Sequence, residues 1–281
     1  MTPTTAARDI HRRVAAVAGV AGRHYAYPGQ RAFSLVARAL RRFPPPGDVT
    51  YSDPDGYVRV ADLRDHMESR VFVGRHRLPK AATTLLRPGD WAIDIGANVG
   101  SIAGQMCRAV GSAGLVWAFE PIPRNVARLQ GFQEANGLSQ LRIFDCALSS
   151  TSGNAPIRVP DDTSSGHASF TASWIDHGRL EVPVRRLDDL TAGFDDAPPL
   201  RLVKLDVEGF ESEVLAGAEA TIRRFRPWIH CEFNDIILRD AGSSSEILLQ
   251  SFEDLGYRVA PAWRRVAAKL DGRNVDLLLS P

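Results

Sequence analysis

From Pro88 onward, short apolar runs alternate with longer segments that are apolar on one side only. The apolar runs predict strands buried on both faces of a sheet, and they are WAIDIG, LVWAFEP, LRIFDCAL, LRLVKLDVEG and RPWIHCEFN. The segments between them predict helices, and they are SIAGQMCRAV, RNVARLQGFQEAN, ESEVLAGAEATIRRF and SEILLQSFEDLG. This strict alternation predicts an α/β fold with a doubly wound, mostly parallel sheet. We expect seven strands, the last two (RVAPAW and VDLLLS) forming an antiparallel pair at the sheet edge.

The pattern divides the chain into two regions. Residues 1–88 have helical apolar spacing over 10–20 and 33–40, then the helix-breaking segment FPPPGD and a strand or short hairpin near Gly56. We interpret this region as a mainly helical N-terminal cap, and residues 89–281 as a ligand-binding domain. Within that domain, residues 151–187 predict two strands around a Ser/Gly-rich loop. That excursion is either a specificity loop held over a site or a solvent-exposed hairpin.

Composition and charge narrow the class of protein. The 281 residues are 44% hydrophobic and 24% charged, as in a globular domain with a sizeable core. A formal net charge of +1 gives no global field to attract nucleic acid, and no apolar run approaches the ~20 residues of a membrane span. The three cysteines are too few and scattered for a disulfide framework or a zinc site. The N-terminus lacks the charge order of a signal peptide, so we expect a cytoplasmic protein. The sequence does not decide between a monomer and a homo-oligomer.

The loop after the first strand of the domain indicates a cofactor site. In DIGANVG, Asp94 ends the apolar run, and Gly96 and Gly100 would let backbone amides approach a ligand closely. The G-x-x-x-G spacing differs from the G-x-G-x-x-G of dinucleotide folds, and no G-K-[ST] follows. The pattern therefore argues against a pyrophosphate cradle and against a phosphate-loop NTPase.

Acidic residues at three strand ends indicate which cofactor this is. Asp94 suits an ammonium group, and Glu120, about 20 residues beyond Gly100, suits the two hydroxyls of an unphosphorylated ribose. Asp145 suits an adenine amino group, with Cys146 and Ala147 along the ring. Each acid alone has an ordinary alternative as a helix cap or surface residue. Together they describe S-adenosylmethionine (SAM), and the expected contacts are Asp94, Gly96, Asn98, Gly100, Ser101, Glu120, Asp145, Ala147 and Asp206.

A second constellation lies at the ends of the next two strands. In KLDVEGFE, Asp206 should face the sulfonium end of the cofactor, and Glu208 follows it, although helix capping alone would explain Glu208. In WIHCEFND, Glu232 and Asn234 share a face, and Glu232 should meet Asp206 across the strand ends. Asp206, Glu232 and Asn234 therefore form a candidate Mg²⁺ site, or the acids supply a general base.

Several residues compete for the role of base. Asp206, Glu208 and Glu232 are candidates, and so is His167 in the Ser/Gly-rich excursion, which could swing over the site. A loop histidine is more often merely solvated, and His230, inside an apolar strand, is more often a satisfied core residue.

These motifs resemble one family. DIGANVG, AFEP with Asn125 beyond it, LDDL at 187–190 and KLDVEGFESEVLAGA are similar to FkbM-type methyltransferases, over a stretch from Val71 to VDLLLS. The resemblance implies a class I SAM methyltransferase with a Rossmann-like fold. It also implies transfer of the SAM methyl group to a hydroxyl of a sugar or natural product, leaving S-adenosylhomocysteine (SAH). The family typically has a glutamate just after the segment that corresponds to RVFVGRH. In this chain that glutamate is missing, and Leu78 lies near its place.

Two alternatives remain at the level of sequence. The first is an N-methyltransferase with an amine acceptor, which would need no strong base. The second is a SAM-binding protein without methyl transfer, against which the acids of K-x-D-x-E-G-x-E argue, since SAM binding alone does not require them.

Overall fold

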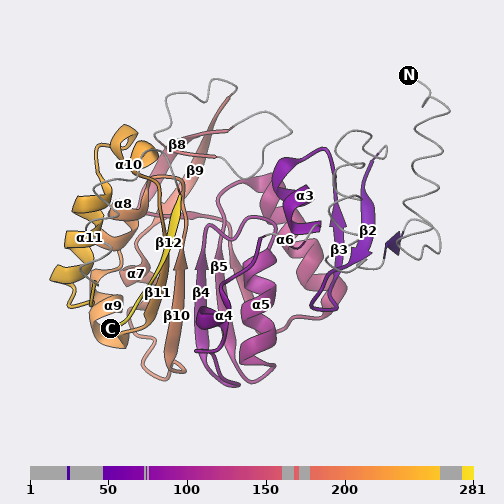
Figure 1. Cartoon of the computed structure of the whole chain (residues 1–281), viewed down its shortest axis with the longest axis horizontal. Helices are drawn as coiled ribbons and strands as arrows, with labels where there is room; N and C mark the ends of the chain where they lie inside the picture. The colour runs from indigo at the N-terminus through magenta and orange to yellow at the C-terminus, as the bar shows by residue number, and fades with distance from the viewer. Residues whose placement is uncertain are drawn as a thin grey trace.

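The computed structural model describes residues 24–25 (backbone only), 47–72, 74, 76–159, 168–170, 178–259 and 274–281. Its centre is a six-stranded sheet in which only the edge strand β12 is antiparallel to its neighbour (Figure 1). In sheet order the strands are β12 (Val275–Leu279), β11 (Trp228–Phe233), β10 (Leu200–Leu205), β4 (Trp91–Ile95), β5 (Leu115–Phe119) and β6 (Leu141–Phe144).

Helices cover both faces of this sheet, as the doubly wound prediction requires (Figure 1). One face packs against α4 (Lys80–Thr83), α5 (Ser101–Val110) and α6 (Pro123–Asn136). The other packs against α7 (Leu187–Thr191), α8 (Glu211–Ala216), α9 (Glu219–Phe225) and α11 (Ser245–Asp254). Successive strand residues alternate between the two cores, so that Ile93 and Ile95 lie in the second core while Ala92 lies in the first.

This alternation places the polar strand residues on the α5 face. Asp94 pairs in register with Lys204, and Lys204 pairs with His230 on the next strand. Two positions further along these strands, Gly96, Asp206 and Glu232 continue the same rows at the carboxyl ends. Because the chain runs from β4 outward to β5 and β6 and then returns to β10, the order of strands reverses between β4 and β10. A ligand crevice is expected at this switch point.

The N-terminal region adds a small sheet beside α6 (Figure 1). Its strands are β1 (His24–Tyr25), β2 (Val49–Ser52) and β3 (Val58–Ala61), and α3 (His66–Phe72) follows them. The guanidinium of Arg59, itself 5% exposed, joins this sheet to the domain. It donates to the carbonyls of Val99 and Gly100, pairs with Asp53 at 2.6 Å and lies 3.9 Å from the ring centre of Phe132.

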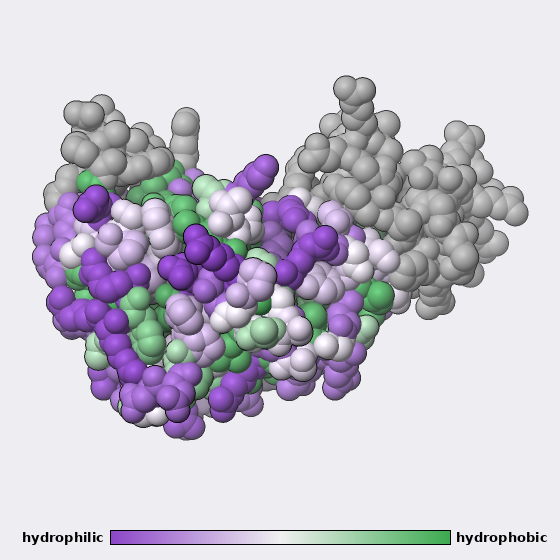
Figure 2. Space-filling view, turned by 90° about the horizontal axis from the view of Figure 1, so that it is seen from below, coloured by the Kyte–Doolittle hydropathy of each residue, from purple (hydrophilic) through white to green (hydrophobic). Residues whose placement is uncertain are grey.

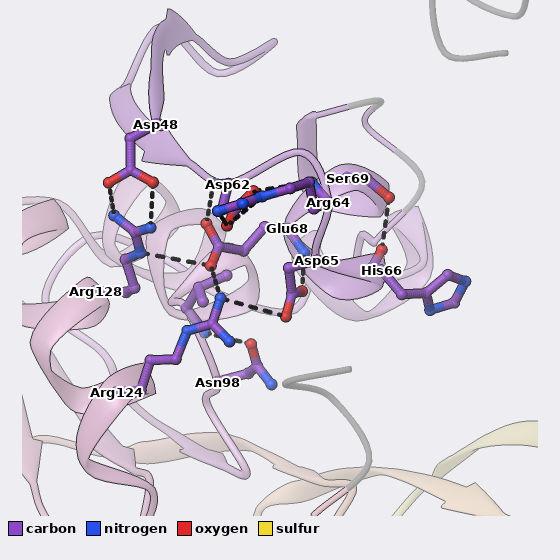
Figure 3. A network of polar contacts seen from close by, with 11 residues as sticks. Asp48, Asp62, Arg64, Asp65, His66, Glu68, Ser69, Asn98, Arg124 and Arg128 are labelled. Atoms are coloured by element: carbon purple, nitrogen blue, oxygen red, sulfur yellow. Dashed lines mark hydrogen bonds and ion pairs between the residues drawn. The ribbon is translucent and has the colours of Figure 1, made fainter. Parts of the chain in front are cut away.

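A polar network fixes α3 against α6 (Figure 3). The carboxylate of Asp65 accepts from the backbone N–H of Glu68 at 2.9 Å and so caps the first turn of α3. Glu68, 2% exposed, lies 3.5 Å from the guanidinium of Arg124 and 3.4 Å from that of Arg128. Burial raises the pKa of Glu68 to about 7, against the opposing effect of Arg128. Arg128 also pairs with Asp48 at 2.6 Å.

Some sequence-based expectations need correction or lie outside the described residues. One helix was expected over 211–225, but it breaks into α8 and α9 at Gly217, where Asp188 caps the new helix by accepting from the N–H groups of Ala220 and Thr221. Helix α10 (Asp235–Asp240) was not expected. Most of the seventh strand, RVAPAW, and the helices expected over 10–20 and 33–40 lie outside the described residues. In the excursion, β8 (Gly153–Arg158) pairs antiparallel with β9 (Arg179–Arg185), and β9 pairs with the short β7 (Ala147–Leu148).

Seen from below, the surface mixes hydrophilic and hydrophobic residues (Figure 2). In the described parts of the chain, only Val60, Ile236 and Ile247 are large hydrophobic residues classed as exposed. No helix there combines the length and the apolar character that crossing a bilayer requires.

The turn after β4 depends on a residue without a side chain. Gly96 has a φ of +78°, and a Cβ placed there would lie 2.0 Å from the carbonyl oxygen of Asp206. Gly137, after α6, has a φ of +60° but open space around it. The two glycines therefore share a left-handed backbone and differ in the room for a side chain.

We expect Gly137→Ala to lower the free energy of unfolding by about 1–2 kcal/mol, the cost of left-handed backbone alone. Gly96→Ala should cost about 2–5 kcal/mol, because the loop after β10 must also move. Urea unfolding of both variants measures the difference. Equal losses would show that the close approach of the two loops contributes nothing to stability.

Candidate functional site

Two cavities open at the carboxyl edge of the sheet. The first, which we call the glycine-loop cavity, is lined by Gly96, Asn98, Glu120, Ile122 and Ala147, among others. The second, which we call the acidic cavity, is lined by Arg70, Lys204, Glu232, Asn234 and Asp276, among others. Four residues line both cavities and mark their junction: Met67, His76, Asp206 and Glu208.

Glu120 is held rigidly at the end of β5. It is 4% exposed, and its two oxygens accept from the N–H of Asn98 at 2.9 Å, the N–H of Ile122 at 3.0 Å and the amide of Asn125 at 3.1 Å. Burial raises the pKa of the carboxyl, while these donors lower it. Oε1 accepts two of these bonds and Oε2 accepts one, so Oε2 retains capacity to accept from a ligand hydroxyl in the glycine-loop cavity.

Residues with a left-handed backbone conformation shape the glycine loop. Asn98 has a φ of +50°, and Gly100, with a φ of +80°, is the residue before α5. Ser101 opens the helix, and its hydroxyl donates to the carbonyl of His76 at 2.7 Å. Gly96 and Asn98 line the glycine-loop cavity, whereas Gly100 and Ser101 are not part of its lining.

Asp94 lies beneath this loop and lines neither cavity. It is 0% exposed, and the ammonium of Lys204 lies 3.5 Å from its carboxylate. Burial raises the pKa of Asp94, and Lys204 opposes that shift. The same ammonium donates to the carbonyl of Gly96 at 2.7 Å and lies 3.4 Å from the carboxylate of Asp206.

The third strand end contributes an apolar wall. Ala147 and Leu148 line the glycine-loop cavity. Asp145 is exposed and is absent from the lining of both cavities, and Cys146 is buried beside it. From the excursion, Ile157, Ala168 and Phe170 close the same cavity, while His167 lies outside the described residues.

Three carboxylates gather where the cavities meet. Asp206, Glu208 and Glu232 each offer an oxygen within 4.8 Å of the others. Burial acts to raise the pKa of Asp206, but the Lys204 ammonium and the other neighbours of the carboxylate together hold that pKa below its usual value. Burial, then the charge of Asp206, raises the pKa of Glu208 to about 8 and that of Glu232 to about 9. At neutral pH Asp206 is therefore ionised, whereas the two glutamates tend to hold protons.

Asn234 has other partners than a metal ion. Its side-chain oxygen accepts from the N–H of Ile237 and caps α10, and its amide donates to Asn274 at 2.7 Å. Asn274 in turn donates to Glu232 at 2.9 Å. The structure brings the proposed Mg²⁺ ligands Asp206 and Glu232 together with Glu208, and Asn234 lines the same cavity.

Sequence reasoning missed His76 and Asp276, which lie near the acids in space. His76 follows α3 and lines both cavities, and Asp276 pairs in register with Glu232 from the antiparallel strand β12. His230 lines the acidic cavity and is 8% exposed, and neither ring nitrogen has a hydrogen-bond partner among the described residues. The segment RVFVGRH was the only sequence signal for His76.

Comparison with known proteins identifies relatives of this chain. It is 29% identical over 216 residues to "2-O-methyltransferase NoeI" of Sinorhizobium fredii, covering 69% of this chain and 81% of that protein. It is 26% identical over 151 residues to "Methyltransferase 1" of Beauveria bassiana, covering 47% of this chain and 60% of that protein.

Solved structures resemble the chain more distantly. A methyltransferase FkbM from Methylobacillus flagellatus matches with a TM-score of 0.36 and 20% identity over 60% of this chain and 44% of that one. Aeropyrum pernix fibrillarin, solved with bound S-adenosyl-L-methionine, matches with a TM-score of 0.41 and 12% identity over 84% of this chain and 94% of that one.

The family match covers much of the lining of both cavities, although Met67, Arg70, His76, Asn274 and Asp276 lie outside it. Residues 94–259, more than half of the chain, match the methyltransferase FkbM domain. They include the glycine loop, Glu120 and all three carboxylates of the junction. The chain therefore belongs to the FkbM methyltransferase family and is a SAM-dependent methyltransferase.

Proposed function

We propose that this methyltransferase transfers the methyl group of SAM to a hydroxyl of a sugar or natural-product acceptor. The observation that carries the proposal is the junction of the two cavities at Asp206, Glu208, Met67 and His76. A cofactor in one cavity would present its sulfonium to an acceptor in the other at this junction. Methyl transfer depends chiefly on aligning oxygen, carbon and sulfur in this way.

In this proposal SAM occupies the glycine-loop cavity. Glu120 accepts from the ribose hydroxyls, Gly96 and Asn98 approach the methionine part, and Ala147 lies along the adenine. Asp206 faces the sulfonium with a carboxylate that stays ionised because of Lys204. Asp94 acts from below by holding Lys204, and Asp145, exposed at the rim, is left as a candidate contact for the adenine amino group.

The acceptor occupies the acidic cavity. Its lining contains carboxyl and amide groups from Glu208, Glu232, Asn234, Asn274 and Asp276, which suit hydroxyl-rich ligands because they accept and donate hydrogen bonds. The name of the relative NoeI, a 2-O-methyltransferase, supports oxygen as the methyl acceptor. An amine acceptor is the second candidate, since the same carboxyls would also bind a cation.

Asp206, Glu208 and Glu232 also have the spacing of a divalent-cation site, and Mg²⁺ held there would polarise the acceptor hydroxyl. However, Asp206 already has a cationic partner in Lys204, and Asn234 caps α10. We therefore propose that side chains alone handle the proton.

On that basis, we expect chelation to leave turnover within about twofold of the untreated rate. The measurement is SAH formation by enzyme dialysed against EDTA, with and without added Mg²⁺. A loss of activity that Mg²⁺ restores would assign the three carboxylates to an ion.

Glu120→Gln should weaken SAH binding by roughly 10–100-fold, because hydrogen bonds to a charged acceptor contribute about 1.5–3 kcal/mol. Isothermal titration with SAH measures the change. Glu134→Gln, on the exposed side of α6, is the matched control and should bind as wild type. Unchanged affinity in Glu120→Gln would contradict the ribose assignment.

The nature of the acceptor atom is tested with paired acceptors. We expect SAH release and methyl incorporation with glycosides and hydroxylated natural products, and none with analogues in which an amine replaces the target hydroxyl. Mass spectrometry of the product locates the methyl group. Methylation of nitrogen in preference to oxygen would replace our proposal by the amine alternative.

A further inference from the structure

We propose that His76 is the general base that removes the proton from the acceptor hydroxyl, an inference that rests on the proposed O-methyl transfer. No residue of the KLDVEGFE or WIHCEFND motifs is required for this role. The argument depends on where His76 lies, on how it is held and on the charges that face it.

His76 lies where the two cavities meet, between the proposed positions of the cofactor and the acceptor. It lines the glycine-loop cavity and the acidic cavity, as do Met67, Asp206 and Glu208. Met67 carries no basic atom, and Asp206 is engaged by the ammonium of Lys204 at 3.4 Å. Glu232, the other acidic candidate, lines the acidic cavity alone and accepts from Asn274. His76 and Glu208 are thus the two bases at the junction without an ion-pair partner among the described residues.

The backbone around His76 is fixed on α5, so its imidazole is held in place by the folded domain. The hydroxyl of Ser101 donates to the carbonyl of His76 at 2.7 Å. Two residues later, the N–H of Leu78 donates to the side chain of Gln105 at 3.2 Å. Between them, Arg77 pairs with Asp55 at 2.7 Å. These contacts anchor residues 76–78, which connect α3 of the cap to α4.

The imidazole is available as a proton acceptor. Neither ring nitrogen has a hydrogen-bond partner within the described part of the chain, and only Nδ1 is fully buried, which leaves Nε2 as the atom that an acceptor hydroxyl can reach. The charged groups that face the ring are Lys204, Arg70 and Arg59, which disfavour its protonation, and Asp206, which favours it. Burial, followed by the charge of Lys204, lowers the pKa of His76 to about 4. At neutral pH the ring is therefore neutral and carries a free lone pair. In contrast, burial and the charge of Asp206 raise the pKa of Glu208 to about 8, so that this carboxyl tends to keep its proton.

The reaction itself makes His76 a stronger base. As the acceptor oxygen attacks the methyl carbon, the carbon–sulfur bond breaks and its electron pair stays on sulfur, which loses its positive charge. The hydroxyl proton passes to the imidazole and later to water, so that one cation disappears beside the ring as another forms on it. Asp206, ionised at the same junction, stabilises the imidazolium.

The test compares His76→Gln and His76→Ala with His66→Gln, a control on the exposed side of α3 (Figure 3). We expect both His76 variants to lose roughly 10²–10⁴-fold in kcat, with SAH affinity unchanged, because a positioned base contributes that much. Added imidazole should restore part of the rate of His76→Ala, which a purely structural role would not allow. His66→Gln should keep the wild-type rate.

The outcomes separate this inference from the proposed function. Wild-type turnover with a hydroxyl acceptor tests the function, and its absence would overturn both. Wild-type turnover together with a near-normal kcat in His76→Gln would overturn the role of His76 alone. The same holds if kcat falls without rescue by imidazole while Glu208→Gln loses as much. Thermal unfolding and SAH titration of each variant establish that it is folded, and His76→Gln, which keeps a polar side chain, provides the comparison if His76→Ala unfolds.

Discussion

The buried ammonium of Lys204 is the interaction on which the site depends. It bridges the switch point of the sheet, since it contacts the carboxylates of Asp94 and Asp206 and the carbonyl of Gly96. Without it, two acids would remain close together in a medium that disfavours charge, and removing one partner of such a buried pair typically costs about 3–5 kcal/mol. The lysine therefore sets the distance between β4 and β10, the protonation state of Asp206 and the path of the glycine loop together.

The cap is a structural part of this site. Arg59 reaches from β3 to the carbonyls of the glycine loop, and the carboxylates of α3 pair with the arginines of α6. These contacts cross from the N-terminal sheet to the elements that hold Glu120 and Ser101. Since α3 supplies Met67 and Arg70 to the cavities, the cap and the sheet together complete the pocket walls.

The sequence indicates where a residue lies whenever that position follows from its place on a strand. Glu120 and Gly96 could be predicted because strand ends and left-handed turns have local signals, and both line the glycine-loop cavity. Asp145 follows β6 as Glu120 follows β5, but its side chain is exposed and lines neither cavity. Asn234 was expected to bind a ligand. Its side-chain oxygen instead caps α10, a helix that the hydrophobic pattern did not predict. His76 was missed because its approach to Asp206 is a tertiary contact between the cap and the sheet, which no periodicity encodes.

The division of the pocket walls has a consequence for how such an enzyme diversifies. The four junction residues line both cavities, so a substitution there would alter both cavities together. Arg70, Asn274 and Asp276 line the acidic cavity alone, and they come from α3 and from the region of the edge strand β12. Substitutions at the periphery of the fold would therefore reshape the acidic cavity and leave the junction at its centre untouched.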